Sequence, residues 1–164
     1  MTLLEFCQWL ETTSVARLVT ESRLGFQVLV AAHLLGLTLS VGMIIWMDLR
    51  LLGRTMAAVP VSVVYRRIAP WALCGFAVMF VSGALLFAGY ATAAYGNVFF
   101  RIKLMALALA GINAIAYHFH TERRIVAWDV GTSTPWAARA AGLISLGVWL
   151  TVIIAGRAMS YTMF

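Results

Sequence analysis

Four long runs of apolar residues dominate this chain and restrict what it can fold into. A helix needs about 20 apolar residues to cross the hydrocarbon of a bilayer, at about 1.5 Å of rise per residue. The predicted spans cover residues 24–47, 71–94, 98–119 and 136–157. Backbone groups in lipid must be hydrogen-bonded within the segment, and these runs lack the alternation of a membrane β-barrel. The sequence therefore predicts an all-α membrane protein, a four-transmembrane-helix bundle.

The composition supports this fold class. Hydrophobic residues make up 63% of the 164 residues and charged residues 11%, whereas soluble domains hold about 45–50% and about 25%. The net charge of +6 would raise nucleic acid as a partner in a soluble protein. Here the basic residues adjoin the apolar spans, where they meet lipid headgroups. We therefore expect the lipid bilayer as a partner and no nucleic acid.

The first 23 residues have a different pattern. Apolar residues recur near helical spacing between Glu5, Glu11, Arg17 and Glu21, which is typical of helices that lie in the membrane interface. The predicted domains are an interfacial amphipathic segment, 1–23, and a four-helix transmembrane domain, 24–164.

The basic residues predict an orientation. Seven lie on the side of the loops after the first and third spans, and five lie on the other side. Cytoplasmic loops carry the excess of Lys and Arg, so both termini are predicted to be periplasmic in a bacterial inner membrane. The seven are Arg50, Arg54, Arg66, Arg67, Arg123, Arg124 and Arg139.

His33 is the first candidate for chemistry, because it lies about nine residues into the first span. A polar ring at that depth is costly unless it has a use. One interpretation is a neutral histidine that is hydrogen-bonded to a neighbouring helix. The other is an axial ligand to haem iron through a neutral imidazole nitrogen.

Three basic residues are expected near the depth of His33. Lys103 lies about five residues into the third span, with Arg101 in the same first turns but nearer the outer face, and Arg157 ends the fourth span on the same side. A haem needs an axial ligand and positive partners for its two propionates, and this set offers both. The alternative is that the three are end residues whose charges extend to the headgroups.

His118 and His120 lie near the inner end of the third span. An offset of about eleven residues, roughly 16 Å, is too large for His33 and His118 to share one iron. The sixth iron position would then be open or filled by Lys103 or Met159. His118 and His120 are weaker candidates for a metal or a second cofactor.

Two further observations bear on the function class. Asp48 is expected to end the first span, so the spans hold no carboxylate, which argues against an acidic proton relay. Met43 with Met47, and Met159 with Met163, have spacing that suits cuprous copper. These pairs are expected on opposite membrane faces, and methionines that fill gaps or face lipid account for them more simply.

Two segments resemble a small bacterial membrane family that includes HemJ-type protoporphyrinogen oxidases and CopD-like copper-resistance domains. They are HLLGLTLSVGMIIWMDLRLLG, residues 33–53, and FRIKLMALALA, residues 100–110, followed by Tyr117-His118. The resemblance implies a b-type haem, with His33 and Lys103 as the matching residues and Tyr117-His118 as a weaker match. The DLRLLG stretch, residues 48–53, and the amphipathic start of the chain depart from HemJ itself.

These observations predict an integral membrane haem b-binding protein in electron transfer, as the membrane subunit of a larger redox complex. His33 would ligate the iron, and Lys103, Arg101 and Arg157 would contact the haem. Other redox subunits or a quinone are the expected partners, and an oligomer is compatible with the pattern. The alternatives are a HemJ-like porphyrinogen oxidase and a CopD-like copper-handling or structural subunit.

Overall fold

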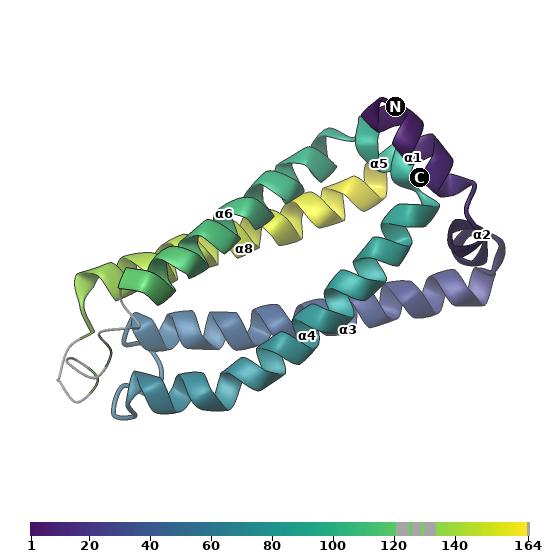
Figure 1. Ribbon diagram of the computed structural model, residues 1–164. Coiled ribbons are helices and arrows are strands. Elements are labelled where there is room, and N and C mark those ends of the chain that lie inside the picture. The colour runs from purple at the N-terminus through teal and green to yellow at the C-terminus, as the bar shows by residue number, and fades with distance from the viewer. Residues whose placement is uncertain (121–124, 126–128, 130–133, 164) are drawn as a thin grey trace.

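Seven helices make up the regular structure of the described residues (Figure 1). The structure is a computed structural model that describes residues 1–120, 125, 129 and 134–163, without the side chain of residue 120. The helices are α1 (Leu3–Glu11), α2 (Ser14–Glu21), α3 (Arg23–Leu51), α4 (Val61–Gly89), α5 (Ala91–Gly96), α6 (Val98–His120) and α8 (Trp136–Met163).

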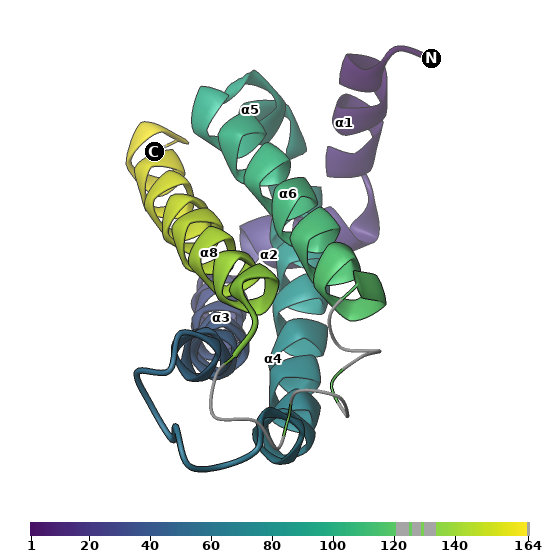
Figure 2. The same ribbon diagram turned by 90° about the vertical axis from the view of Figure 1, so that its left-hand side faces the viewer.

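The four long helices α3, α4, α6 and α8 are long and apolar enough to cross a membrane. This confirms the all-α class and the four spans. Helix α3 packs against α4, α6 packs against α8, and α3 joins the two pairs through its contact with α8. Figure 2 looks nearly along the bundle and shows α6 and α8 above α3 and α4. Both termini lie at the end of the bundle that carries α1 and α5 (Figure 1). We call this the outer end and the opposite end the inner end, as labels that carry no membrane orientation.

The helices extend beyond the predicted spans at several ends. Helix α3 continues to Leu51, and α4 begins at Val61, ten residues before the expected start. The predicted second span covers two elements, because α4 ends at Gly89 and the short α5 follows Tyr90. Hydropathy marks only the lipid-embedded part of a helix. Backbone hydrogen bonds carry it further into the interface, with Arg66 and Arg67 exposed.

A close crossing of α3 and α4 depends on small residues. A Cβ atom at Gly75 would lie 2.5 Å from the backbone nitrogen of Ser40, and one at Gly36 would lie 2.8 Å from that of Met79. Ser40 is fully buried there, and its hydroxyl group donates a hydrogen bond to the Gly36 carbonyl of its own helix. Small residues let membrane helices approach this closely. The crossing therefore fixes α4 beside the middle of α3.

The central core joins α3, α6 and α8. Val41, Ala106, Trp149 and Val152 are buried together, and the ring of Phe76 from α4 packs against Trp149 at 5.7 Å between centroids. A second cluster of Leu51, Val61 and Ala138 closes the inner end. The outward faces of the long helices carry exposed apolar side chains, as expected for helices whose outward side faces lipid.

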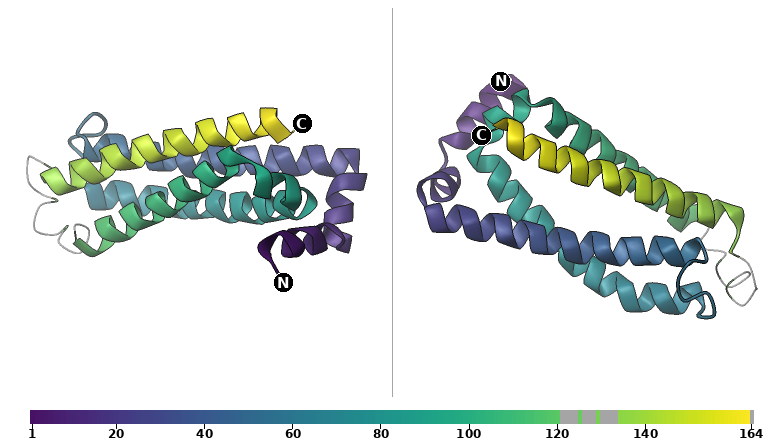
Figure 3. Two further views of the ribbon diagram at one scale, coloured as in Figure 1. Left: turned by 90° about the horizontal axis from the view of Figure 1, so that it is seen from above. Right: turned by 180° about the vertical axis from the view of Figure 1, so that it is seen from behind.

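Residues 1–23 fold as two short helices against the outer end of the bundle (Figure 3). Helix α1 starts with a capping box between Thr2 and Glu5, which satisfies free N–H groups of its first turn. Its Cys7 is buried, and its Trp9 is exposed. Glu11 accepts hydrogen bonds from the backbone and hydroxyl of Thr92, at 2.8 and 3.0 Å. The interfacial position of this segment stays a prediction.

Candidate functional site

His33 lies on α3 and faces α4, and its ring is held by two polar groups of that helix. Nδ1 lies 3.0 Å from the Met79 carbonyl oxygen and 3.1 Å from the Ser82 hydroxyl oxygen. A carbonyl can only accept, so Nδ1 is the protonated nitrogen of the ring. The Ser82 hydroxyl donates to the Val78 carbonyl at 2.6 Å, which leaves its oxygen free to accept from the ring. His33 is therefore anchored to the neighbouring helix.

Gly83 provides the space for this ring. A Cβ atom at Gly83 would lie 3.0 Å from Cε1 of His33 and 3.3 Å from Nδ1. Contacts that short are uncommon between real atoms, so a side chain here would shift the ring by a few tenths of an ångström. Ser82 and Gly83 are adjacent on α4 and position the imidazole together. Ser82 accepts a hydrogen bond from the ring, and Gly83 leaves space for it.

The second ring nitrogen, Nε2, is free for a ligand. Among the described residues it has no hydrogen-bond partner. It is also not fully enclosed by the protein. Histidines that bind metals usually donate the other ring N–H to a carbonyl or carboxylate, which fixes the tautomer. The arrangement at His33 meets this requirement for an axial ligand.

Lys103 approaches the same region from α6. It lies on the face of α6 that carries Ala106 and Ala110 toward the core. Its Nζ lies 3.9 Å from the place that a Cβ of Gly156 would take on α8. Its charge also interacts electrostatically with His33. The structure therefore places Lys103 within range of an electrostatic interaction with His33.

Arg101 and Arg157 are placed differently. Both are exposed at the outer end, and each is paired with a tyrosine near it in sequence. Arg101 donates to the Tyr95 carbonyl at 3.2 Å. Arg157 donates to the Tyr161 hydroxyl at 2.7 Å, and its guanidinium stacks on that ring at 4.5 Å. Their position fits charged ends at the headgroups, and no contact with His33 or Lys103 is present in the described part of the chain.

The other two histidines lie at the far end of α6. His118 is exposed, and its ring meets Phe119 edge to face. The side chain of His120 lies outside the described residues. Among the residues described, no group of three or more His, Cys, Asp or Glu side chains is arranged to hold a metal ion.

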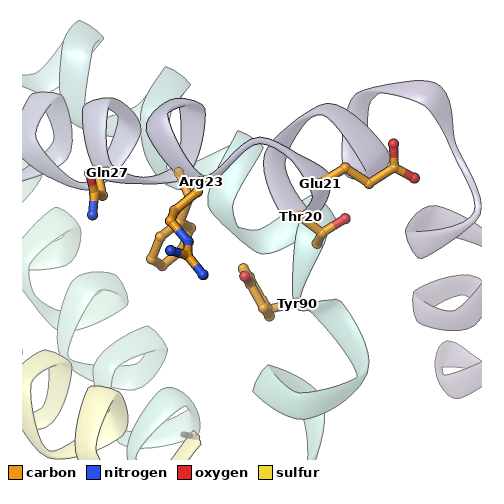
Figure 4. Close-up of a pocket in the computed structure, with 6 residues that line it drawn as sticks. Thr20, Glu21, Arg23, Gln27 and Tyr90 are labelled. Carbon is orange, nitrogen blue, oxygen red and sulfur yellow. The ribbon is translucent and has the colours of Figure 1, made fainter.

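A polar hollow of about 460 Å³ lies above His33 at the outer end of α3, and the sequence had not indicated it. Phe26 is two helical turns from His33, and its ring packs against Tyr90 at 5.6 Å. Figure 4 shows Arg23 and Gln27 pointing into the space beside Tyr90, while the Glu21 carboxylate points away. The six lining residues are Thr20, Glu21, Arg23, Phe26, Gln27 and Tyr90.

The sequence also missed Ser82 and Gly83. A serine in a transmembrane run usually bonds to its own helix, and a glycine usually serves packing. The two are adjacent in an uncharged span, at a level on α4 that an antiparallel neighbour would match with the middle of α3. A serine next to a glycine at the depth of His33 is the one sequence signal that could have identified Ser82 and Gly83 as its neighbours.

Comparisons with known proteins give one match. No curated protein and no solved structure matches the chain. The model of a family of unknown function, DUF6644, matches residues 6–162, which is nearly the whole chain. By its sequence and along almost its entire length, this four-helix protein belongs to the DUF6644 family.

Proposed function

We propose that this protein binds one haem b through His33 and works in electron transfer, as the membrane subunit of a larger redox complex. The observation that carries the proposal is the state of the His33 ring. Nδ1–H is held by the Met79 carbonyl at 3.0 Å, and Nε2 is left with its lone pair. This is the form in which a histidine binds haem iron.

The surroundings of His33 support a haem more than another ligand. Lys103 supplies a positive charge inside the bundle. Phe76 and Trp149 pack together in the neighbouring core, and aromatic side chains suit a flat apolar macrocycle. The resemblance of residues 33–53 and 100–110 to HemJ-type proteins points to the same cofactor.

The protein's own residues would tune the cofactor. A bound haem supplies a centre that accepts and donates one electron. Met79 and Ser82 fix the orientation of the His33 ring, and Gly83 leaves room for it. The charge of Lys103 favours the reduced state of a nearby centre, because reduction removes a positive charge. The apolar outer shell keeps bulk water away.

The location we propose is the bacterial inner membrane, with both termini in the periplasm. The α3–α4 connection and the start of α4 carry Arg54, Arg66 and Arg67 on the surface. Exposed arginines at this end suit the cytoplasmic side. His33 and Lys103 would then lie in the periplasmic half of the membrane, within reach of a periplasmic or quinone partner.

Purification after expression with sufficient haem tests the proposal. We expect about one b-type haem per chain by the pyridine haemochrome assay, and reversible reduction by dithionite followed by reoxidation. Complementation of a strain that lacks protoporphyrinogen oxidase separates the alternatives, since an electron-transfer subunit would not restore growth. Protein that is folded but free of haem would contradict the proposal, and copper in its place would favour the CopD-like alternative.

A further inference from the structure

Asp48 is buried inside the bundle. From the sequence, it was expected at the membrane surface, at the end of the first span. Helix α3 continues through it to Leu51, and only 5% of its surface is exposed. Its backbone packs against α8, where a Cβ at Gly142 would lie 3.2 Å from the Asp48 carbonyl oxygen. The helix that carries the first predicted span therefore holds one buried carboxyl group. Because Gly142 has no side chain, α8 can pack closely against α3 at Asp48.

The Asp48 carboxyl group has one polar neighbour on α8. The Ser145 hydroxyl donates a hydrogen bond to it, and Ser145 is itself 7% exposed. The other carboxyl oxygen, Oδ2, is enclosed and has no hydrogen-bond partner in the described part of the chain. A buried polar atom without a partner is uncommon in native proteins and needs an explanation.

No described cation neutralises this carboxyl group within ion-pair distance. Arg50, two residues further along α3, directs Nε and Nη2 to the Val59 carbonyl at 2.9 and 2.6 Å. Tyr117 of α6 packs at the neighbouring Leu51 cluster. The remaining basic side chains described at this end are exposed, on the connection after α3, on α4 and on α8: Arg54, Arg66, Arg67 and Arg139.

We propose that Asp48 is a proton-exchange site at the inner end of the bundle, which takes up one proton on Oδ2 and releases it again. An ionised carboxylate that is buried without a counter-ion is costly, whereas the neutral acid is not. The reaction is carboxylate plus proton to carboxylic acid, with Ser145 as the polar neighbour of the group. The site is separate from His33, since fifteen residues of α3, roughly 22 Å, lie between them.

Carbon-13 NMR of the protein labelled at the aspartate carboxyl carbons tests this directly. The chain has two aspartates, Asp48 and Asp129, so two signals are expected. Asp48→Asn assigns the first signal. Asp129→Asn is the matched control, because Asp129 accepts hydrogen bonds from the Ser62 backbone and hydroxyl. Either variant alone assigns both signals, so one that fails to fold does not prevent the measurement.

We expect the Asp48 signal at the carboxylic acid position near pH 6, where solvated aspartates with a pKa of about 3.9 are ionised. It should move to the carboxylate position as the pH rises, and replacing Na⁺ with K⁺ or choline should not change it. A signal at the carboxylate position throughout would overturn the proposal. So would a signal that follows Na⁺ concentration at constant pH, since that outcome means a cation site. Neither reading requires bound haem.

Discussion

The imidazole ring of His33 on α3 packs directly against Gly83 on α4. A Cβ atom at Gly83 would come within 3.0 Å of Cε1 of His33, so the imidazole lies closer to α4 than it comfortably could beside a residue with a side chain. The contact joins the two helices at the level where Nδ1 meets the Met79 carbonyl. The position of Nε2, and with it any cofactor site, depends on this glycine.

Gly83→Ala should therefore weaken haem binding without unfolding the protein. Overpacking of this kind costs about 1–3 kcal/mol, which corresponds to roughly five- to 150-fold weaker binding. Haem titration of the purified apoprotein measures the change. Gly147→Ala is the control, because a Cβ there meets nothing within 4 Å. Equal affinity of the two variants would show that the ring does not need this space.

Gly75→Ala should destabilise the pair of helices α3 and α4. The new methyl group would lie 2.5 Å from the Ser40 backbone nitrogen, and backbone cannot move aside as a flexible side chain can. We expect a loss of about 1–3 kcal/mol or more in the free energy of unfolding, measured by denaturation in detergent micelles. Gly42→Ala on α3 has open space around its Cβ and should leave stability almost unchanged. Similar losses for both variants would contradict the close crossing.

The fold was predictable from the sequence because the spans and the helical state follow from length and the needs of the backbone in lipid. The ends were less predictable. Hydropathy could not show that α3 continues past Asp48, because one buried acid that is hydrogen-bonded to Ser145 on another helix looks the same in sequence as an acid at the surface. Tertiary contact with α8 decides its position.

Lys103→Met should lower the midpoint potential of a bound haem. Removing a positive charge near the iron stabilises the oxidised form relative to the reduced form. Lys103→Arg keeps the charge and should restore most of the potential, while Arg101→Gln, at an exposed position, should have a small effect because solvent screens it. Spectroelectrochemical titration of the four proteins measures this. A larger shift for Arg101→Gln than for Lys103→Met would place the haem elsewhere.

Glu11→Ala should loosen α1 from the bundle. It removes two hydrogen bonds from Thr92 to a carboxylate, each worth about 1.5–3 kcal/mol when a charged group takes part. Cys7 is 2% exposed under α1, so its alkylation by a water-soluble maleimide should become at least about ten-fold faster. A Cys74→Ser background leaves Cys7 as the single thiol, because the chain has two cysteines.

The matched control for this measurement is Glu21→Ala at the exposed end of α2, which should leave the alkylation rate of Cys7 unchanged. Faster alkylation in both variants would mean that the thiol is uncovered by a general loss of stability. An unchanged rate in Glu11→Ala would mean that α1 is held by its apolar face alone.

The candidate site was predictable only in part. The depth of His33 and Lys103 along their helices follows from residue counting, and the structure places the two within range of an electrostatic interaction. Counting gives depth but not rotation, so it could not show that Arg101 and Arg157 turn outward to Tyr95 and Tyr161. Nor could it show the Met79 carbonyl, because a backbone acceptor leaves no trace in the residue types.

The visible absorption spectrum of the purified protein, compared with those of His33→Ala and His118→Ala, tests the haem proposal most directly. The wild-type protein and His118→Ala should show a Soret band of equal intensity per chain, because His118 is exposed at the other end of α6. His33→Ala should lack that band while keeping its helical circular dichroism. A wild-type protein without a Soret band after haem-sufficient expression, or a band that survives in His33→Ala, would contradict ligation of haem by His33.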